Sequence, residues 1–301
     1  MVDAGHSGEQ EAPVPVVLDT DIGVDVDALF TLAFILASPE LQLAGVTTVS
    51  GDVRMRARTA CALLEAAGRQ DVPVAAGSQA GCGCDQPSES PPNVDARSAA
   101  SLLLQMAGLH EGALCLITTG PLTNAARMAR DHPCAFRSLR GLFIQGGDFK
   151  GVDARSIRPE ESFRLDPPAA DMVLTSGAPV LLCGLNATRR TSLSPARLNE
   201  LEALDTPRAR LLASAVRHSV PSGAAAPLHA AVAAAALFRS KLITWRSLPA
   251  RVQTVGPEAG VLAFERKPSR TACGVRVAVD LDVEGFESLF WRRICAFAGE
   301  T

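Results

Sequence analysis

The stretch Asp19-Thr-Asp-Ile-Gly-Val-Asp-Val-Asp27 places four aspartates within nine residues, between two apolar segments. Residues 14–18, which precede it, form a short apolar run typical of a buried strand. Residues 28–37, which follow it, are apolar on most sides of a helix, as expected for a helix packed beneath a sheet. The pattern predicts an acidic site at the carboxyl end of the first strand.

Strand-like and helix-like segments continue to alternate after this turn. Strands are predicted at 43–49, 72–76, 113–118, 139–144 and 180–185, and helices at 56–67, at 99–108 and from 122 onward. This alternation predicts an α/β fold with a single open, mainly parallel (mixed) sheet and helices on both faces. The acidic turn and the turns at 51–52, 119–120 and 146–147 should then gather at one edge of the sheet, where ligands bind.

The totals favour one domain and give no sign of a nucleic-acid or membrane partner. A chain of 301 residues without repeats or a linker suits one domain over 15–301, preceded by a disordered leader over 1–14 that lacks the pattern of a signal peptide. The net charge of −3 gives no general attraction to nucleic acid or anionic membrane. The strongest apolar run, 230–238, is about half of a membrane span. We expect a cytoplasmic protein without nucleic-acid or membrane partners.

The cysteines fit a reducing compartment. Five of the eight lie in apolar or helical stretches, as reduced buried thiols do: Cys61, Cys115, Cys134, Cys183 and Cys295. Cys82 and Cys84 lie in a Gly-rich loop instead. A metal site there would need two more ligands, so we interpret the segment as a flexible loop with two free thiols.

The acidic turn itself has two interpretations. In the first, its carboxylates serve the helix: Asp27 caps a helix that begins at Ala28, and Asp25 is solvated. In the second, carboxylates converge on a hard cation or on sugar hydroxyls. Asp19 and Asp21 point to the same side of an extended chain, and like charges at a buried strand end repel unless they are neutralised. This density of charge favours the second interpretation.

Several motifs together resemble one known family, the inosine/uridine-preferring nucleoside hydrolases. The resemblance spans nearly the whole chain after residue 14. The segments that carry it are Asp19–Asp27, Leu43–Gly51, Asp71–Gly77, Thr119–Asn124, Gly146-Gly147, Leu165–Ala170 and the closing segment Val275–Phe297. It implies hydrolysis of the N-glycosidic bond of a nucleoside with a calcium ion and no organic cofactor. It also implies a homo-oligomer, either a dimer or a tetramer.

The resemblance assigns roles to residues of the acidic turn. Asp21 would be a calcium ligand and the general base that takes a proton from the attacking water. Asp27 would be a second ligand, and the carbonyl of Thr119 would complete the protein's share of the metal shell. Asp25, the other catalytic candidate, would serve the sugar hydroxyls.

Other positions would bind the substrate, although most of them depart from the family pattern. Asp19 matches the first aspartate of the motif, and Asp52 replaces the asparagine of a Gly-Asn pair. Glu160 and Ser162 correspond to a Glu-x-Asn motif, with the acid kept and the amide lost. Gln145 stands where family members have methionine.

The largest departure lies late in the chain. Family members read His-Asp-Pro-Leu-Ala where this chain reads Ala225-Ala-Pro-Leu-His229. A histidine that assists the leaving base and an aspartate that binds calcium are therefore replaced by alanine. His229, about one helical turn further along, is a candidate substitute in substrate binding; its alternative role is ordinary packing.

Because of these losses, the sequence predicts neither a single cation for the turn nor a single activity for the protein. Calcium could still bind the remaining carboxylates, or Arg54, Arg56 and Arg58, which follow the second strand, could neutralise the turn internally. Three functions remain possible: a divergent hydrolase of N-ribosyl bonds, a fold reused for a calcium-independent reaction in a specialised biosynthetic pathway, and a non-catalytic binding protein.

Overall fold

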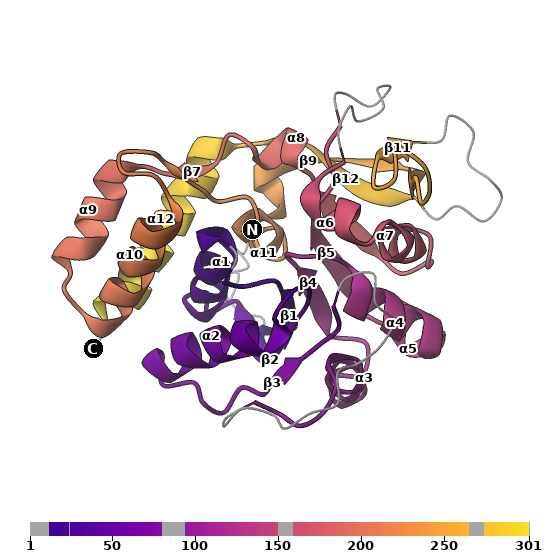
Figure 1. Cartoon of the computed structure of the whole chain (residues 1–301), viewed down its shortest axis with the longest axis horizontal. Coiled ribbons are helices and arrows are strands. Elements are labelled where there is room, and N and C mark those ends of the chain that lie inside the picture. Colours follow the sequence, from indigo (N-terminus) through magenta and orange to yellow (C-terminus); the bar gives the residue numbers. More distant parts are fainter. Residues whose placement is uncertain (1–11, 24, 80–93, 150–158, 265–273, 301) are drawn as a thin grey trace, which may run out of the picture.

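The computed structural model describes residues 12–23, 25–79, 94–149, 159–264 and 274–300 (Figure 1). Residues 1–11 of the predicted leader and the loop with Cys82 and Cys84 lie outside these ranges. The central sheet contains β1 (Val14–Thr20), β2 (Leu41–Thr48), β3 (Val74–Ala76), β4 (Cys115–Thr118), β5 (Gly141–Gln145), β6 (Val180–Cys183), β9 (Ile243–Leu248) and β12 (Val275–Leu281).

Helices cover both faces of this sheet, as Figure 1 shows. They are α1 (Val26–Leu36), α2 (Val53–Ala66), α3 (Ala99–Leu109), α4 (Thr123–Asp131), α5 (Pro133–Arg137), α6 (Glu161–Leu165), α7 (Pro167–Leu174), α8 (Leu185–Thr188), α9 (Pro195–Ala203), α10 (Pro207–Ser219), α11 (Ala231–Ala235), the 3-10 helix η1 (Ser240–Leu242) and α12 (Val283–Gly299). Two short ribbons complete the described structure, β7 (Ser192–Leu193) with β8 (Ala226–Pro227) and β10 (Ala250–Val252) with β11 (Leu262–Phe264).

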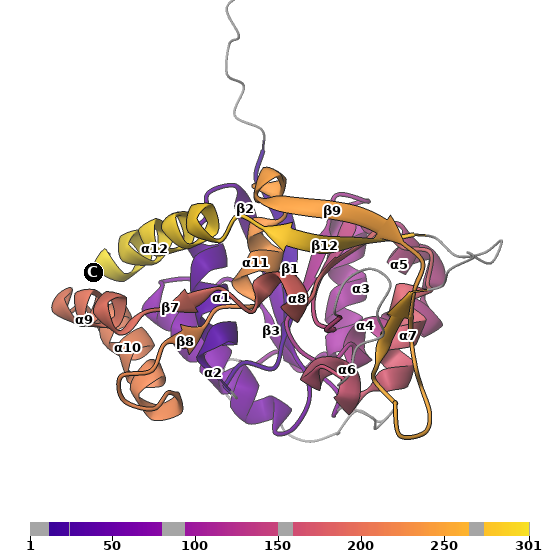
Figure 2. The same ribbon diagram turned by 90° about the horizontal axis from the view of Figure 1, so that it is seen from above.

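The strand order confirms the predicted fold class. The eight strands are arranged β3-β2-β1-β4-β5-β6-β12-β9, and all neighbours are parallel except β9, which runs antiparallel to β12 at the edge. Figure 2 shows these last two strands lying side by side. The parallel strands are joined by helical crossovers, which place helices on the two faces.

One predicted cap is wrong. Helix α1 begins at Val26 rather than Ala28, and its N-cap is Asp25, whose side chain accepts a hydrogen bond from the Asp27 backbone N–H at 3.1 Å. Asp25 has the extended backbone that an N-cap requires, and its side chain is exposed. Asp27 is instead buried inside the first turn and is free to contact another part of the chain.

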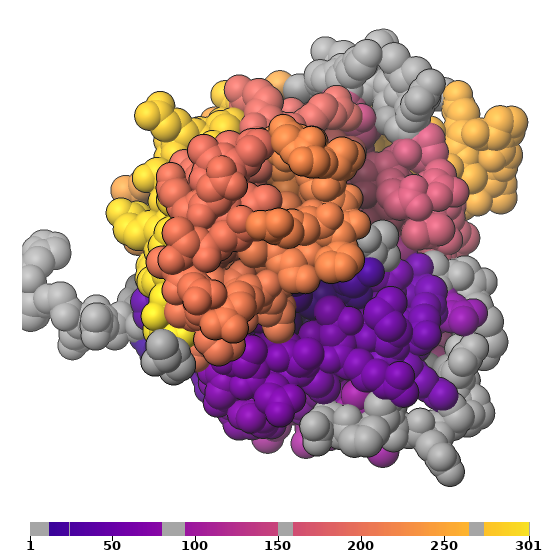
Figure 3. Space-filling model, turned by 60° about the vertical axis from the view of Figure 1, so that its left-hand side comes forward, coloured from indigo at the N-terminus to yellow at the C-terminus, as the bar shows by residue number. Residues whose placement is uncertain are grey.

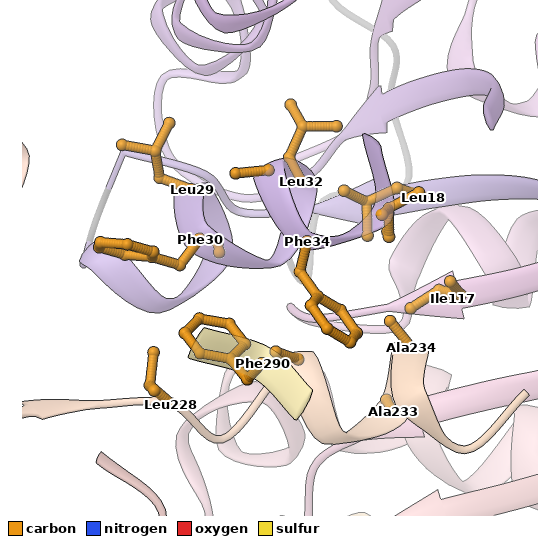
Figure 4. Close-up of a cluster of buried hydrophobic side chains, with 14 of the residues drawn as sticks. Leu18, Leu29, Phe30, Leu32, Phe34, Ile117, Leu228, Ala233, Ala234 and Phe290 are labelled. Carbon is orange, nitrogen blue, oxygen red and sulfur yellow. The ribbon is translucent and has the colours of Figure 1, made fainter. Parts of the chain in front are cut away.

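The core is divided by the sheet into two layers, and β1 contributes to both. Val16 and Leu18 pack in the layer with α1 and α12, whereas Val17 packs in the layer with α3 and α4. In the first layer Phe34 stacks on Phe290, with ring centroids 5.5 Å apart (Figure 4). A strand buried on both faces reads as a continuous apolar run, which is why 14–18 stood out in the sequence.

The predicted gathering of turns at one edge of the sheet is seen at the ends of β1, β2 and β4, which are joined by backbone hydrogen bonds. The Val49 N–H donates to the Thr20 carbonyl at 3.0 Å, and the Thr119 N–H donates to the Asp19 carbonyl at 3.0 Å. The acidic turn therefore lies between the turns that follow β2 and β4. In the described part of the chain, no helix is long and apolar enough to cross a membrane.

Candidate functional site

Asp21 lies at the carboxyl edge of the sheet, directly after β1, and is half-buried. It packs against Gly120: a Cβ added to that glycine would lie 3.0 Å from the Cβ and the Cγ of Asp21. Burial, followed by the negative charge of Asp25, raises the pKa of Asp21 to about 7. A carboxylate with this pKa can accept a proton near neutral pH.

Asp27 connects the acidic turn to the late part of the chain. Its Oδ2 accepts hydrogen bonds from the backbone N–H groups of His229 at 2.8 Å and Ala230 at 2.9 Å. Its buried Oδ1 has no hydrogen-bond partner within the described residues. Burial, with a further contribution from Asp25, raises the pKa of Asp27 well above its usual value.

His229 is half-buried beside this contact. Its Nδ1 lies 3.0 Å from the Thr188 carbonyl oxygen, so this nitrogen must carry the proton, and in the neutral ring Nε2 then carries the lone pair. Burial lowers the pKa of His229, although the charge of Asp25 acts in the opposite direction. The ring is therefore neutral near pH 7 and can accept a hydrogen bond through Nε2.

Asp19 is completely buried behind the turn. Its Oδ1 accepts hydrogen bonds from Thr47 Oγ1 at 2.6 Å and Asn124 Nδ2 at 2.8 Å. Burial raises the pKa of Asp19 to about 6, against the lowering effect of these two hydrogen bonds. Its contacts connect β1, β2 and α4, so the described geometry gives Asp19 a role within the protein, and substrate binding by it stays a prediction.

Thr119 and Asp52 occupy the neighbouring turns. The buried Thr119 hydroxyl donates to Thr20 Oγ1 at 2.8 Å, next to Asp21. Asp52 is exposed and is the N-cap of α2, because its Oδ1 accepts from the N–H groups of Arg54 and Met55. These hydrogen bonds, chiefly the one from Met55, lower the pKa of Asp52.

Glu160 brings a further buried carboxylate to this edge and adds to the negative potential at Asp21. Its oxygens accept from the backbone N–H groups of Gly147, Ser162 and Phe163, at 3.0, 3.1 and 3.3 Å. Burial raises the pKa of Glu160 despite these bonds. Gln145, the buried last residue of β5, lies just before the Gly146-Gly147 turn.

The late segment offers little polar chemistry of its own. Ala226 is buried in β8, where it pairs with Leu193 of β7, and Ala225 before it is exposed. In Figure 3 the orange surface of this late part of the chain meets the violet surface of α2, with indigo atoms of the first strand and helix between them. The late segment therefore contacts the acidic turn through backbone groups, the N–H groups of His229 and Ala230 that donate to Asp27.

The described residues at this site supply too few oxygen ligands for a calcium ion. Calcium takes about six to eight oxygen ligands, usually with several carboxylates among them. Across the part of the chain that the structure describes, no three Asp, Glu, His or Cys side chains converge closely enough to hold one metal ion. Asp27 Oδ2 already accepts hydrogen bonds from two amides, and Ala226 has no side-chain oxygen. The residues present do not fit a fully ligated calcium ion.

Several contacts at the site had no clear signal in the sequence. Asn124 ends the motif Thr119–Asn124, which is the one sequence signal for its contacts with the strand ends. Thr47, by contrast, looks like any strand threonine. The two amides that hold Asp27 carry no sequence signal, because every residue except proline has a backbone N–H group.

Comparison with known proteins places this chain in a family. The model of the family described as inosine-uridine preferring nucleoside hydrolase matches residues 16–288. A curated relative, the inosine-uridine preferring nucleoside hydrolase of Crithidia fasciculata, is 28% identical over 305 residues, covering 92% of this chain and 96% of that protein. Uridine nucleosidase 1 of Arabidopsis thaliana is 31% identical over 303 residues, covering 90% of each chain.

Solved structures agree. The purine-preferring ribonucleoside hydrolase from Gardnerella vaginalis superposes with a TM-score of 0.80 at 26% identity, covering 95% of this chain and 99% of that one. The chain belongs to the inosine-uridine preferring nucleoside hydrolase family, which is known for using a metal ion. It is a nucleoside-hydrolase-like protein, and the matches do not favour a reused fold or a non-catalytic binding protein.

Proposed function

We propose that this protein hydrolyses the N-ribosyl bond of a nucleoside at the carboxyl edge of its sheet. The observation that carries the proposal is Asp21, a half-buried carboxylate whose pKa of about 7 suits proton transfer at neutral pH. It lies near Asp25 and Glu160, whose negative charges act on it. Negative charge of this kind stabilises a positively charged, oxocarbenium-like sugar.

The reaction needs one base and one leaving group. As the bond between the sugar carbon and the base nitrogen breaks, the oxygen of a water molecule bonds to that carbon and Asp21 takes the water's proton. Asp25 assists by binding the sugar hydroxyls. The departing base takes its proton from solvent, since the neutral His229 ring offers it an acceptor at Nε2 rather than an acid.

The remaining site residues orient the substrate. Glu160 and Ser162 are proposed to bind ribose hydroxyls, and Gln145 and His229 to contact the base. Asp52, the exposed N-cap of α2, is also proposed to bind the substrate. Asp19 acts from behind the turn, where its bonds to Thr47 and Asn124 fix the end of β1.

Calcium stays a prediction. The resemblance assigns it to Asp21, Asp27 and Thr119, and it is supported by Asp27 Oδ1, which has no hydrogen-bond partner within the described residues. Because the donor set is incomplete, the steps above rest on the protein's own groups. Calorimetric titration of metal-free protein with calcium tests the assignment directly.

We also propose a cellular compartment and an oligomeric state for the protein. The described cysteines form no disulfide, which suits the reducing cytoplasm. We further propose a homo-oligomer, either a dimer or a tetramer, because the resemblance implies one. Light scattering coupled to size-exclusion chromatography measures the mass of the assembly.

Replacement of Asp21 tests the proposed chemistry. With inosine and uridine as substrates and free ribose as the readout, Asp21→Asn should lower kcat/KM by about 10²- to 10⁴-fold, the usual contribution of a general base. In the unsubstituted protein kcat/KM should rise with pH through about 7, because Asp21 must lose its proton to act as a base. Asp71→Asn, at an exposed aspartate paired with Arg69, is the matched control and should keep full activity. Equal activity of Asp21→Asn and Asp71→Asn would refute the proposal.

A further inference from the structure

Arg56 is a buried arginine next to the acidic turn. It lies in the first half of α2, and only 6% of it is exposed. Its Nε donates to the Ser50 carbonyl at 2.6 Å, and its Nη1 donates to the carbonyls of Asp21 and Ile22, the latter at 3.2 Å. The guanidinium thus joins the turn after β2 to the turn after β1.

The backbone is shaped to receive this side chain. Ser50 has a φ of 68°, in the left-handed region that L residues rarely adopt, and it presents its carbonyl to Arg56. Gly51, with a φ of 58°, leaves room, since a Cβ there would lie 3.1 Å from Arg56 Nη2. A strained backbone conformation persists only where surrounding contacts stabilise it. Here the stabilising contacts are those with the Arg56 guanidinium.

The charge of Arg56 acts on the same carboxylates that crowd the turn. It interacts electrostatically with Asp21, Asp25 and Asp52. Arg54 and Arg58, the other arginines of this helix segment, act on Asp52, and Arg58 is exposed. Of the three, Arg56 is therefore the one held against the turn, and a guanidinium keeps its charge at every pH that proteins tolerate.

We propose that the Arg56 guanidinium is the resident counter-cation of the acidic turn, supplying the positive charge that a divalent ion would otherwise supply there. The proposal concerns the charge balance of the turn and does not depend on whether nucleosides are hydrolysed. It accounts for two observations together: an incomplete set of metal donors, and a buried arginine built into the same turn.

Calcium binding is the direct test. Chelator-treated protein is titrated with calcium chloride by calorimetry, and melting temperature is measured with calcium and with chelator. The unsubstituted protein should show no binding up to about 1 mM calcium, the weak end of protein calcium sites, and no change in melting temperature. Binding at micromolar calcium would overturn the proposal without any substitution.

Three variants separate charge from hydrogen bonding. Arg56→Gln removes the charge but keeps a donor for the carbonyls, and it should bind calcium about tenfold or more tightly than the unsubstituted protein. Arg56→Lys keeps the charge and should remain indifferent to calcium. Arg58→Gln, the matched control at an exposed position of the same helix, should also remain indifferent.

Other outcomes would contradict the proposal. If Arg56→Gln folds and binds calcium no better than Arg58→Gln, Arg56 is only a structural clamp. If Arg56→Gln does not fold, Arg56→Lys and the unsubstituted protein still decide: calcium binding by either one would show that a positive charge at position 56 does not replace the metal.

Discussion

The acidic turn, residues 19–27, and the late segment, residues 225–230, face each other but differ in what they bring to the site. The turn contributes Asp21, Asp25 and Asp27, whose charges act on one another. The late segment contributes backbone N–H groups and the His229 ring, while Ala225 and Ala226 contribute no polar side chain. The acidic turn thus contributes charged side chains to the site, and the late segment contributes backbone N–H groups and a neutral ring.

Placing a charge in the late segment should be the most disruptive of these changes. Ala226 is buried against apolar neighbours, so Ala226→Asp places a carboxylate there without a partner. We expect the free energy of unfolding in urea to fall by about 3–5 kcal/mol, the usual cost of an uncompensated buried charge. The loss should be larger at high pH than at low pH, because protonation removes the charge.

Ala225→Asp is the matched control, since Ala225 is exposed and its carboxylate would stay in water. Its stability should equal that of the unsubstituted protein. If both variants unfold at the same urea concentration, the late segment has room and polarity for a carboxylate, and the contrast between the two regions fails.

The acidic turn should make stability depend on pH through Asp19. Its folded-state pKa of about 6 lies above the ordinary value of 3.8, so the folded protein holds this proton more tightly than the unfolded chain does. The resulting stabilisation is present below pH 3.8 and is lost as the pH rises through about 6, by about 3 kcal/mol in total.

Asp19→Asn keeps an acceptor oxygen for Thr47 and Asn124 but cannot ionise. Its free energy of unfolding, measured in urea across this pH range, should therefore fall less steeply than that of the unsubstituted protein. Asp280→Asn, at an exposed position of β12, should leave the slope unchanged. Identical slopes for all three proteins would show that Asp19 is not titrating with a raised pKa.

Removing the contact between the two regions, the hydrogen bonds accepted by Asp27, should have the smallest effect on stability of these changes. Asp27→Ala leaves the N–H groups of His229 and Ala230 without their acceptor, whereas Asp27→Asn keeps an oxygen in the same place. We expect the alanine variant to be less stable than the asparagine variant by about 2 kcal/mol in urea unfolding. Equal stability would mean that water satisfies these amides and that the two regions are not joined through Asp27.

The sequence predicted the fold better than it predicted the site. The burial of residues 14–18 and 28–37 can be predicted from their composition, because a strand or helix enclosed on most sides must be apolar. The position of the acidic turn followed from the same alternation of strand and helix. The cap at Asp25 was missed because both Asp25 and Asp27 are good capping residues, and which one is buried depends on packing with residues 229–230.

The contact of Arg56 with the acidic turn shows a different limit of prediction from the sequence. Arg54, Arg56 and Arg58 alternate along a few residues and are equivalent as letters. The turn of α2 buries Arg56 and leaves Arg58 in water, and this depends on where the helix begins, which Asp52 sets as its N-cap. A difference of two positions along the helix therefore separates a buried charge from a surface one.

The bonds from Asp27 to His229 and Ala230 also impose an order on biosynthesis. Asp27 leaves the ribosome 202 residues before His229 does. Throughout that interval the first strand and its acidic turn have been made, but the amides that hold Asp27 have not. A nascent chain that stops before residue 230 thus carries the motif by which the family is recognised without the contact that closes it, and the site becomes complete only in the last quarter of translation.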